Sequence, residues 1–197
     1  MSQYFEENNK LIDEKKLITI KFKDKYYKVY TNNGVFSKEK LDYGTKLLIE
    51  TITKQKLTGS ILDLGCGYGI IGIILASNFP NIEVDMCDIT SRAITLSQEN
   101  TQNLNLTNTN IFKSDIYENI TKKYNYIVTN PPIRAGKETL RKFLFGAKDH
   151  LKEDGELWFV MRKNHGVKSM IKELTDIYKI EIIEKSKGFY IISCQPK

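Results

Sequence analysis

The sequence has few of the residues that build disulfide frameworks or metal centres. Its 197 residues include three cysteines and two histidines. Cys66, Cys87 and Cys194 have no close paired spacing, so free thiols in a reducing cytoplasm are the simplest interpretation. His150 and His165 are isolated from other potential ligands along the chain. We therefore expect a cytoplasmic protein without disulfides and without a bound metal.

Long apolar runs are missing as well. No stretch approaches the roughly 20 apolar residues of a membrane-spanning helix. Residues 1–16 are charged and lack the apolar segment of a signal peptide. No Gly-Lys-Ser or Gly-Lys-Thr occurs, which excludes a phosphate-binding P-loop. These absences argue against a membrane-spanning or secreted protein and against a P-loop enzyme.

What the sequence does contain is enough apolar residues for a core and a small excess of positive charge. Hydrophobic residues make up 41% of the chain, and 30 basic residues against 24 acidic ones give a net charge of +6. This excess is compatible with a nucleic-acid partner but does not require one. The length fits one domain with a short appendage. We expect residues 1–55, a hairpin and a helix, to pack on one compact unit formed by residues 56–197.

Strand and helix patterns alternate through most of the chain. Residues 18–22 and 26–30 predict a hairpin, and Asp42 can cap a helix over 43–53. From Ser60 onward the patterns predict strands over 61–64, 83–88, 110–113, 124–129, 156–161, 179–185 and 189–194, with helices over 70–77, 91–103, 136–151 and 168–177. Repeated strand–helix units predict an α/β fold. We expect a Rossmann-like, doubly wound, seven-stranded and mostly parallel sheet with an antiparallel last strand.

Polar residues follow four successive predicted strands of this sheet. Asp63 leads into a glycine-rich turn, Asp88 lies 25 residues further on, and Asp115 and Asn130 follow the next two strands. Because ligands bind beyond the carboxyl ends of parallel strands, these side chains should share one site. The joint pattern predicts a nucleoside-type cofactor, with Asp88 spaced to bind both hydroxyls of a ribose.

The position of Asp63 favours one kind of cofactor. Residues 67–72 match the dinucleotide fingerprint Gly-x-Gly-x-x-Gly. A carboxylate leading into that turn would, however, repel a pyrophosphate. It suits a cofactor that has no phosphate and carries positive charge at one end, and S-adenosylmethionine, with an ammonium and a sulfonium, is such a cofactor.

The stretch Asn130-Pro131-Pro132-Ile133 ends the strand over 124–129. Two consecutive prolines cannot continue a strand ladder, so they hold the chain in a rigid turn. The Asn130 side-chain oxygen and the Pro131 carbonyl can both accept hydrogen bonds from a planar NH2 group, which turns its lone pair toward a methyl donor. We expect such a site to work by positioning and electrostatic preorganisation. An ordinary proline-rich turn is the alternative interpretation.

Residues 63–69, Asp88, 114–115 and 130–133 together resemble the class I S-adenosylmethionine-dependent methyltransferases. More narrowly, the chain is similar to the methyltransferase small domain family, which includes the bacterial 16S ribosomal RNA guanine-N2 methyltransferases. The resemblance covers nearly the whole chain from residue 17 and is supported by residues 34–37, 41–45, 130–137, 162–166 and 185–189. Two departures stand out. Many members have Tyr or Phe at the position of Ile133, and the longer ribosomal RNA enzymes carry an extra N-terminal domain.

The resemblance implies a role for each residue of the site. Asp63 and the glycine turn would bind the methionine end of S-adenosylmethionine, Asp88 the ribose, and Asp115 the adenine amino group. The residues expected to contact the cofactor are Phe36, Asp63, Gly65, Cys66, Gly67, Gly69, Asp88, Ile89, Ser114, Asp115, Ile116 and Asn130. The residues expected to act on the substrate are Asn130, Pro131, Pro132 and Ile133. For Phe36, Ile89 and Ile116, ordinary core packing is the alternative.

A base inside a duplex could not reach such a pocket, so an RNA target must be unpaired or flipped. We expect basic side chains on the rim to contact phosphates, with solvated surface charge as the alternative; these are Arg134, Lys137, Arg141, Arg162 and Lys163. The leading hypothesis is methylation of guanine N2 in ribosomal RNA. Methylation of DNA adenine or of a protein glutamine is a second hypothesis, and a cofactor-binding RNA assembly factor without catalysis is a third.

Overall fold

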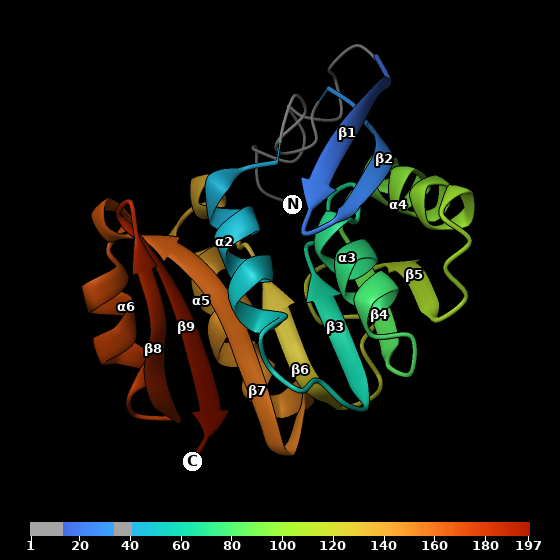
Figure 1. The fold of residues 1–197 in the computed structure, drawn as a ribbon. Coiled ribbons are helices and arrows are strands. Elements are labelled where there is room, and N and C mark those ends of the chain that lie inside the picture. The colour runs from blue at the N-terminus through green and yellow to red at the C-terminus, as the bar shows by residue number, and fades with distance from the viewer. Residues whose placement is uncertain (1–13, 34–40) are drawn as a thin grey trace.

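The computed structural model describes residues 14–33 and 41–197. Its centre is a seven-stranded sheet with the strand order β5-β4-β3-β6-β7-β9-β8 (Figure 1). These strands are β3 (Ser60–Leu64), β4 (Glu83–Asp88), β5 (Thr109–Lys113), β6 (Tyr124–Thr129), β7 (Leu151–Arg162), β8 (Tyr178–Ser186) and β9 (Phe189–Pro196). Strands β3 to β7 pair in parallel, whereas β9 runs antiparallel to both of its neighbours. The predicted mostly parallel sheet with an antiparallel last strand is confirmed.

Helices cover both faces of this sheet (Figure 1). The α-helices are α2 (Tyr43–Ile52), α3 (Ile70–Asn78), α4 (Ser91–Asn103), α5 (Lys137–Gly146) and α6 (Val167–Leu174), and the 3-10 helices are η1 (Ile133–Ala135), η2 (Ala147–His150) and η3 (Lys163–His165). Successive strand residues point to opposite faces. Ile61 and Val128 therefore join the core beneath α2 and α3, while Leu62 and Ile127 join the core beneath α5 and α6. Among the described helices, none is both long and apolar enough to cross a membrane.

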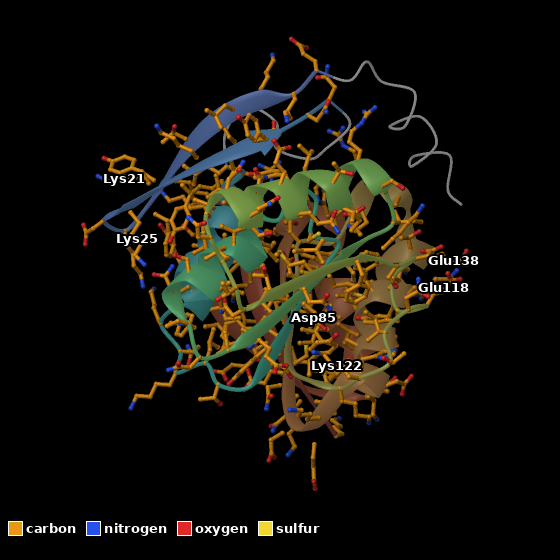
Figure 2. All side chains as sticks on the ribbon, turned by 90° about the vertical axis from the view of Figure 1, so that its right-hand side faces the viewer. Lys21, Lys25, Asp85, Glu118, Lys122 and Glu138 are labelled. Carbon is orange, nitrogen blue, oxygen red and sulfur yellow. The ribbon has the colours of Figure 1, made fainter. Side chains whose placement is uncertain are left out.

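A separate antiparallel hairpin of β1 (Lys16–Phe22) and β2 (Lys25–Thr31) covers the outside of α3 and α4. Its inner face contributes Phe22 and Val29 to the core that also contains α3. The Asn100 side chain of α4 accepts a hydrogen bond from the Tyr30 N–H at 2.7 Å and donates one to the Tyr30 carbonyl at 2.9 Å. Lys21 extends from the exposed outer face (Figure 2). Lys25, paired with the buried Phe22, lies on the inner side, and its Nζ donates to the Ser77 carbonyl of α3 at 3.3 Å.

The helix predicted over 136–151 is shorter than expected, and the strand after it begins earlier. Helix α5 ends at Gly146, and β7 starts at Leu151. The reason lies in contacts from distant parts of the chain. The Tyr117 hydroxyl donates to the Phe143 carbonyl at 2.6 Å, and the Tyr178 hydroxyl donates to the Leu144 carbonyl at 3.0 Å. These hydroxyls satisfy carbonyls at the end of the helix, and the chain continues as the 3-10 helix η2.

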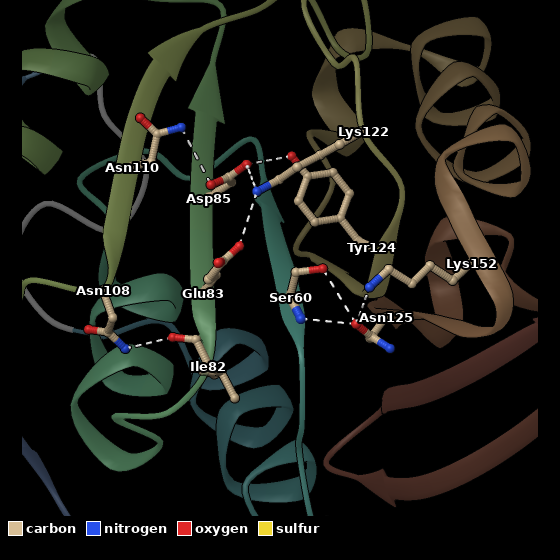
Figure 3. Close-up of polar contacts among 10 residues, drawn as sticks. All are labelled: Ser60, Ile82, Glu83, Asp85, Asn108, Asn110, Lys122, Tyr124, Asn125 and Lys152. Carbon is tan, nitrogen blue, oxygen red and sulfur yellow. Dashed lines mark hydrogen bonds and ion pairs between the residues drawn. The ribbon is translucent and has the colours of Figure 1, made fainter.

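A polar network surrounds the buried Asp85 of β4 (Figure 3). Its carboxylate accepts hydrogen bonds from the Tyr124 hydroxyl at 2.6 Å and the Asn110 amide at 3.4 Å. Lys122 lies 3.0 Å from the same carboxylate and 3.6 Å from Glu83. A buried carboxylate is tolerated when it is paired and hydrogen-bonded in this way. The network therefore links the segment at the start of β6 to strands β4 and β5.

Tyr124→Phe is expected to lower the free energy of unfolding by about 1–3 kcal/mol, because the variant removes a hydrogen bond to a buried charged group. Urea unfolding of the two proteins measures the difference. Tyr126→Phe on the same strand is the matched control, since no described residue hydrogen-bonds its half-buried side chain, and it should change the stability by less than about 0.5 kcal/mol. Equal losses in the two variants would contradict a special role of the Asp85 network.

Candidate active site

The order of the strands reverses at β3, because the chain proceeds from β3 to β4 and β5 on one side and then returns to place β6 on the other. Such a reversal opens a crevice at the carboxyl ends of the strands. A cavity of about 730 Å³ lies there. Its wall includes residues that follow each of β3, β4, β5, β6 and β7, together with the start of α2.

The turn after β3 is fixed by hydrogen bonds to the end of β4. The N–H groups of Gly65 and Cys66 both donate to the Cys87 carbonyl, at 2.9 and 3.0 Å. The Gly67 N–H donates to the Asp88 carboxylate at 3.0 Å. Gly65 and Gly67 have φ angles of 73° and 59°, a conformation that glycine adopts without strain. The turn thus presents its backbone to the cavity in one fixed shape.

Asp63 lies behind this turn rather than in the wall of the cavity. It is fully buried, and Oδ2 accepts a hydrogen bond from the Gly72 N–H at 2.8 Å. Its Oδ1 atom has no hydrogen-bond partner among the described residues. Burial raises the pKa of Asp63 to about 7, against the effect of the Gly72 hydrogen bond and aided by the charge of Asp88. A cation bound near this turn would stabilise the ionised form of Asp63 and lower its pKa. Gly69, like Asp63, is outside the wall.

Asp88, by contrast, faces the cavity at the end of β4. Its carboxylate accepts hydrogen bonds from the Thr90 N–H at 2.9 Å and from the Thr90 hydroxyl at 3.0 Å, in addition to the one from Gly67. Burial raises the pKa of Asp88, and these hydrogen bonds oppose the rise. The carboxylate is therefore held in one orientation at the cavity.

Four further predicted residues, Ile89, Ser114, Asp115 and Ile116, also line the cavity. Ile116 has a φ angle of 52°, which is unfavourable for a β-branched residue. The Ser114 hydroxyl donates to the Ile116 carbonyl at 2.9 Å and holds this conformation. Backbone strain of this kind is found at ligand sites, where the surrounding structure imposes it. Phe36 lies outside the described residues.

Asn130 and the two prolines form the edge of the cavity after β6. The Asn130 amide nitrogen Nδ2 donates to the Thr45 hydroxyl at 2.8 Å and lies 3.5 Å from Asp42 Oδ2. Its oxygen Oδ1 accepts no hydrogen bond from the described residues. Pro131 and Ile133 lie in the same wall. The site therefore presents an amide oxygen that can accept a hydrogen bond from a bound amino group.

The structure separates the five basic residues that the sequence suggested for RNA contact. Arg134 and Arg162 line the cavity. Lys163 is exposed in η3 but is not in the wall. Lys137 and Arg141 form ion pairs with Glu173, at 3.0 and 2.7 Å, on the outside of α5. The cavity rim thus holds two of the five residues.

Sequence reasoning assigned Asp42 only its role as a helix cap, which is confirmed, and assigned none to Tyr43, Thr45 and Phe189; all four residues line the cavity. The rings of Tyr43 and Phe189 are 5.6 Å apart, and the Arg162 guanidinium lies 4.8 Å from the centre of the Phe189 ring. The sequence signal that could have found these four residues is the family resemblance, which the stretches 41–45 and 185–189 support. In the described part of the chain, no group of three or more His, Cys, Asp or Glu side chains could hold a metal ion.

Comparison with known proteins places these features in a family. The model of the methyltransferase small domain matches residues 26–193. An uncharacterized protein of Bacillus subtilis (strain 168) is 37% identical over 195 residues, which cover 98% of this chain and 97% of that protein. Ribosomal RNA small subunit methyltransferase C of Vibrio cholerae is 39% identical over 131 residues, or 64% of this chain. The corresponding enzyme of Psychromonas ingrahamii is 32% identical over 168 residues, or 83% of this chain.

These ribosomal RNA enzymes are longer than this chain, which covers 38% of the Vibrio cholerae protein and 47% of the Psychromonas ingrahamii protein. Among solved structures, the fold is similar to that of the Thermus thermophilus 16S rRNA N2 G1207 methyltransferase in complex with AdoMet and guanosine. The TM-score is 0.82 at 21% identity, and the match covers 93% of this chain and 51% of that one.

Proposed function

The chain belongs to the methyltransferase small domain family, a family of S-adenosylmethionine-dependent enzymes, and we propose that it methylates an exocyclic amino group of a nucleobase. The specific substrate that we propose is guanine N2 in ribosomal RNA. The names of the longer relatives support ribosomal RNA as the substrate. The single observation that carries the proposal is the orientation of Asn130, whose amide nitrogen is engaged by Thr45 while its oxygen stays available at the cavity.

The cavity has the residues that such a cofactor requires. S-adenosylmethionine supplies an electrophilic methyl group when it is bound. We assign its ribose to Asp88, its adenine to Ile89, Ile116 and Asp115, and its methionine end to the turn over residues 65–67. The buried Asp63 acts through that turn: a cation bound there would stabilise its carboxylate, one oxygen of which has no partner among the described residues and whose pKa is raised by burial.

Asn130 and Pro131 orient the acceptor nitrogen. The lone pair of a guanine N2 group is conjugated with the ring, so it is poorly available for attack. Hydrogen bonds from the NH2 group to Asn130 Oδ1 and to the Pro131 carbonyl turn the nitrogen toward tetrahedral geometry. Both acceptors are fixed in advance by the strand end and the diproline, so the site works by positioning and electrostatic preorganisation.

The identity of the substrate class is tested with labelled S-adenosylmethionine. The protein is incubated with ribosomal RNA, small ribosomal subunits, DNA and a protein lysate in separate reactions. We expect label in ribosomal RNA, free or in the subunit, and nucleoside digestion should yield N2-methylguanosine. Label in DNA or protein alone would show that the substrate is not ribosomal RNA. Cofactor binding without label in any reaction would refute the enzymatic proposal.

Arg162→Ala is expected to raise the KM for RNA several-fold. The plot of log affinity against log salt should become less steep by about 1, because one phosphate contact is lost. Titrations at several salt concentrations measure the slope. Lys142→Ala is the control, since Lys142 is exposed on α5 and pairs with Glu138 outside the cavity. An unchanged slope in Arg162→Ala would show that Arg162 does not contact a phosphate.

A further inference from the structure

The side chain of Asn130 belongs to a chain of hydrogen bonds that starts at helix α2. Asp42 caps this helix, and its Oδ2 atom accepts from the Thr45 N–H at 3.0 Å. The Thr45 hydroxyl lies 3.4 Å from the same oxygen and accepts the hydrogen bond from Asn130 Nδ2 at 2.8 Å. The chain of donors thus runs from Asn130 through Thr45 to Asp42.

This chain distinguishes the two orientations of the Asn130 amide. The hydroxyl hydrogen of Thr45 is directed at Asp42, so the oxygen lone pairs of Thr45 face Asn130. Rotation of the amide by 180° would place Oδ1 near the Asp42 carboxylate, which can only accept, and the Thr45 hydroxyl would have to give up its contact with Asp42 to donate to Oδ1 instead. The rotation would also turn Nδ2, a donor, toward the bound substrate. A donor there cannot accept a hydrogen bond from an amino group.

The fold builds this arrangement before any ligand binds. Thr45 is 5% exposed and lies in the first turn of α2, whereas Asn130 follows β6, so 85 residues of chain separate the two hydrogen-bonding partners. The N-cap bond from Thr45 to Asp42 fixes the helix start. The hydroxyl of Thr45 is therefore held at the point where Asn130 enters the cavity.

We propose that Asp42 and Thr45 are positioning residues that fix the amide orientation of Asn130 and so keep its oxygen available to the substrate amino group. The proposal rests on the function proposed above. It assigns to the start of α2 a part in turnover, separate from binding of the cofactor or of the RNA.

Thr45→Val removes the hydroxyl and keeps the shape of the side chain. We expect kcat to fall by about 10- to 100-fold, because the acceptor oxygen of Asn130 loses its fixed position, while KM for RNA and affinity for S-adenosylmethionine change by less than about threefold. Thr45→Ser retains the hydroxyl and should restore kcat to within a few-fold of the wild-type value. Thr51→Val is the matched control on the same helix, because among the described residues the Thr51 hydroxyl bonds only to the Leu47 carbonyl.

Three results of these turnover and binding measurements would overturn the proposal. One is wild-type kcat in Thr45→Val. Another is a Thr45→Ser variant as slow as Thr45→Val, which would show that the hydroxyl is not the relevant group. The third is a loss of cofactor affinity as large as the loss of kcat, which would make Thr45 a cofactor contact instead.

A measurement without turnover separates this proposal from the proposed function. The side-chain amide of Asn130 is identified in an ¹⁵N NMR spectrum by its absence in Asn130→Ala. We expect slow hydrogen exchange of this amide in the wild type, fast exchange in Thr45→Val, and wild-type exchange in Thr51→Val. Identical exchange in the wild type and Thr45→Val would show that Thr45 does not hold the Asn130 amide, and it would overturn the proposal. If the wild type methylates nothing, the proposed function fails while this test still reports on Asn130.

Discussion

Replacement of Asn130 by alanine is expected to lower methyl transfer by about 1,000-fold, the cost of removing a preorganised hydrogen-bonding group from an active site. The variant loses the amide oxygen that accepts from the substrate amino group. Affinity for S-adenosylmethionine should stay within several-fold of the wild-type value, because Asp88, Asp115 and the glycine turn are untouched. Single-turnover transfer from labelled cofactor to RNA measures the first quantity, and calorimetric titration measures the second.

Asn125→Ala is a suitable control for this experiment, because Asn125 lies near the opposite end of the same strand β6. Its side chain accepts hydrogen bonds from the Ser60 N–H at 3.0 Å and from Lys152 at 2.9 Å (Figure 3). We expect Asn125→Ala to lower stability and to leave turnover unchanged. If Asn130→Ala lost cofactor binding as severely as turnover, Asn130 would be part of the cofactor site and its role with the substrate would be wrong.

The sequence predicted the sheet and the family because both depend on local patterns. Apolar strands and amphipathic helices alternate along the chain, and a parallel sheet necessarily brings the ends of β3, β4, β5 and β6 to one edge. The position of Asp88 in the cavity wall follows from that rule. The family is confirmed by the match over residues 26–193.

The remaining features depend on contacts between distant residues, which no local pattern encodes. Lys137 and Arg141 follow the diproline closely, yet Glu173 of α6 pairs with both of them. Asp63 ends up behind the turn because the Gly72 N–H of α3 binds its carboxylate from the other side. Thr45 bonds to Asn130 only because α2 begins where β6 ends. Each of these placements follows from the packed arrangement of helices on the sheet.

Asp88→Ala is expected to weaken binding of S-adenosylmethionine by at least about 100-fold. Two hydrogen bonds from ribose hydroxyls to a carboxylate are lost, each contributing about 1.5–3 kcal/mol. Calorimetric titration with the reaction product S-adenosylhomocysteine measures the effect without turnover. Asp176→Ala is the control for loss of one negative charge, because Asp176 is exposed in the connection between α6 and β8.

A loss of affinity in Asp88→Ala has two physical causes that must be separated, because Asp88 also accepts the hydrogen bond from Gly67. Removing the carboxylate deprives the ribose of its partner and also releases the glycine turn. The 2′-deoxy analogue of S-adenosylhomocysteine distinguishes the two. If Asp88 binds the ribose, the wild type should prefer the ribose form by about tenfold or more, and Asp88→Ala should lose this preference. If the preference survives in the variant, the turn alone explains the loss of affinity, and the ribose must lie elsewhere in the cavity.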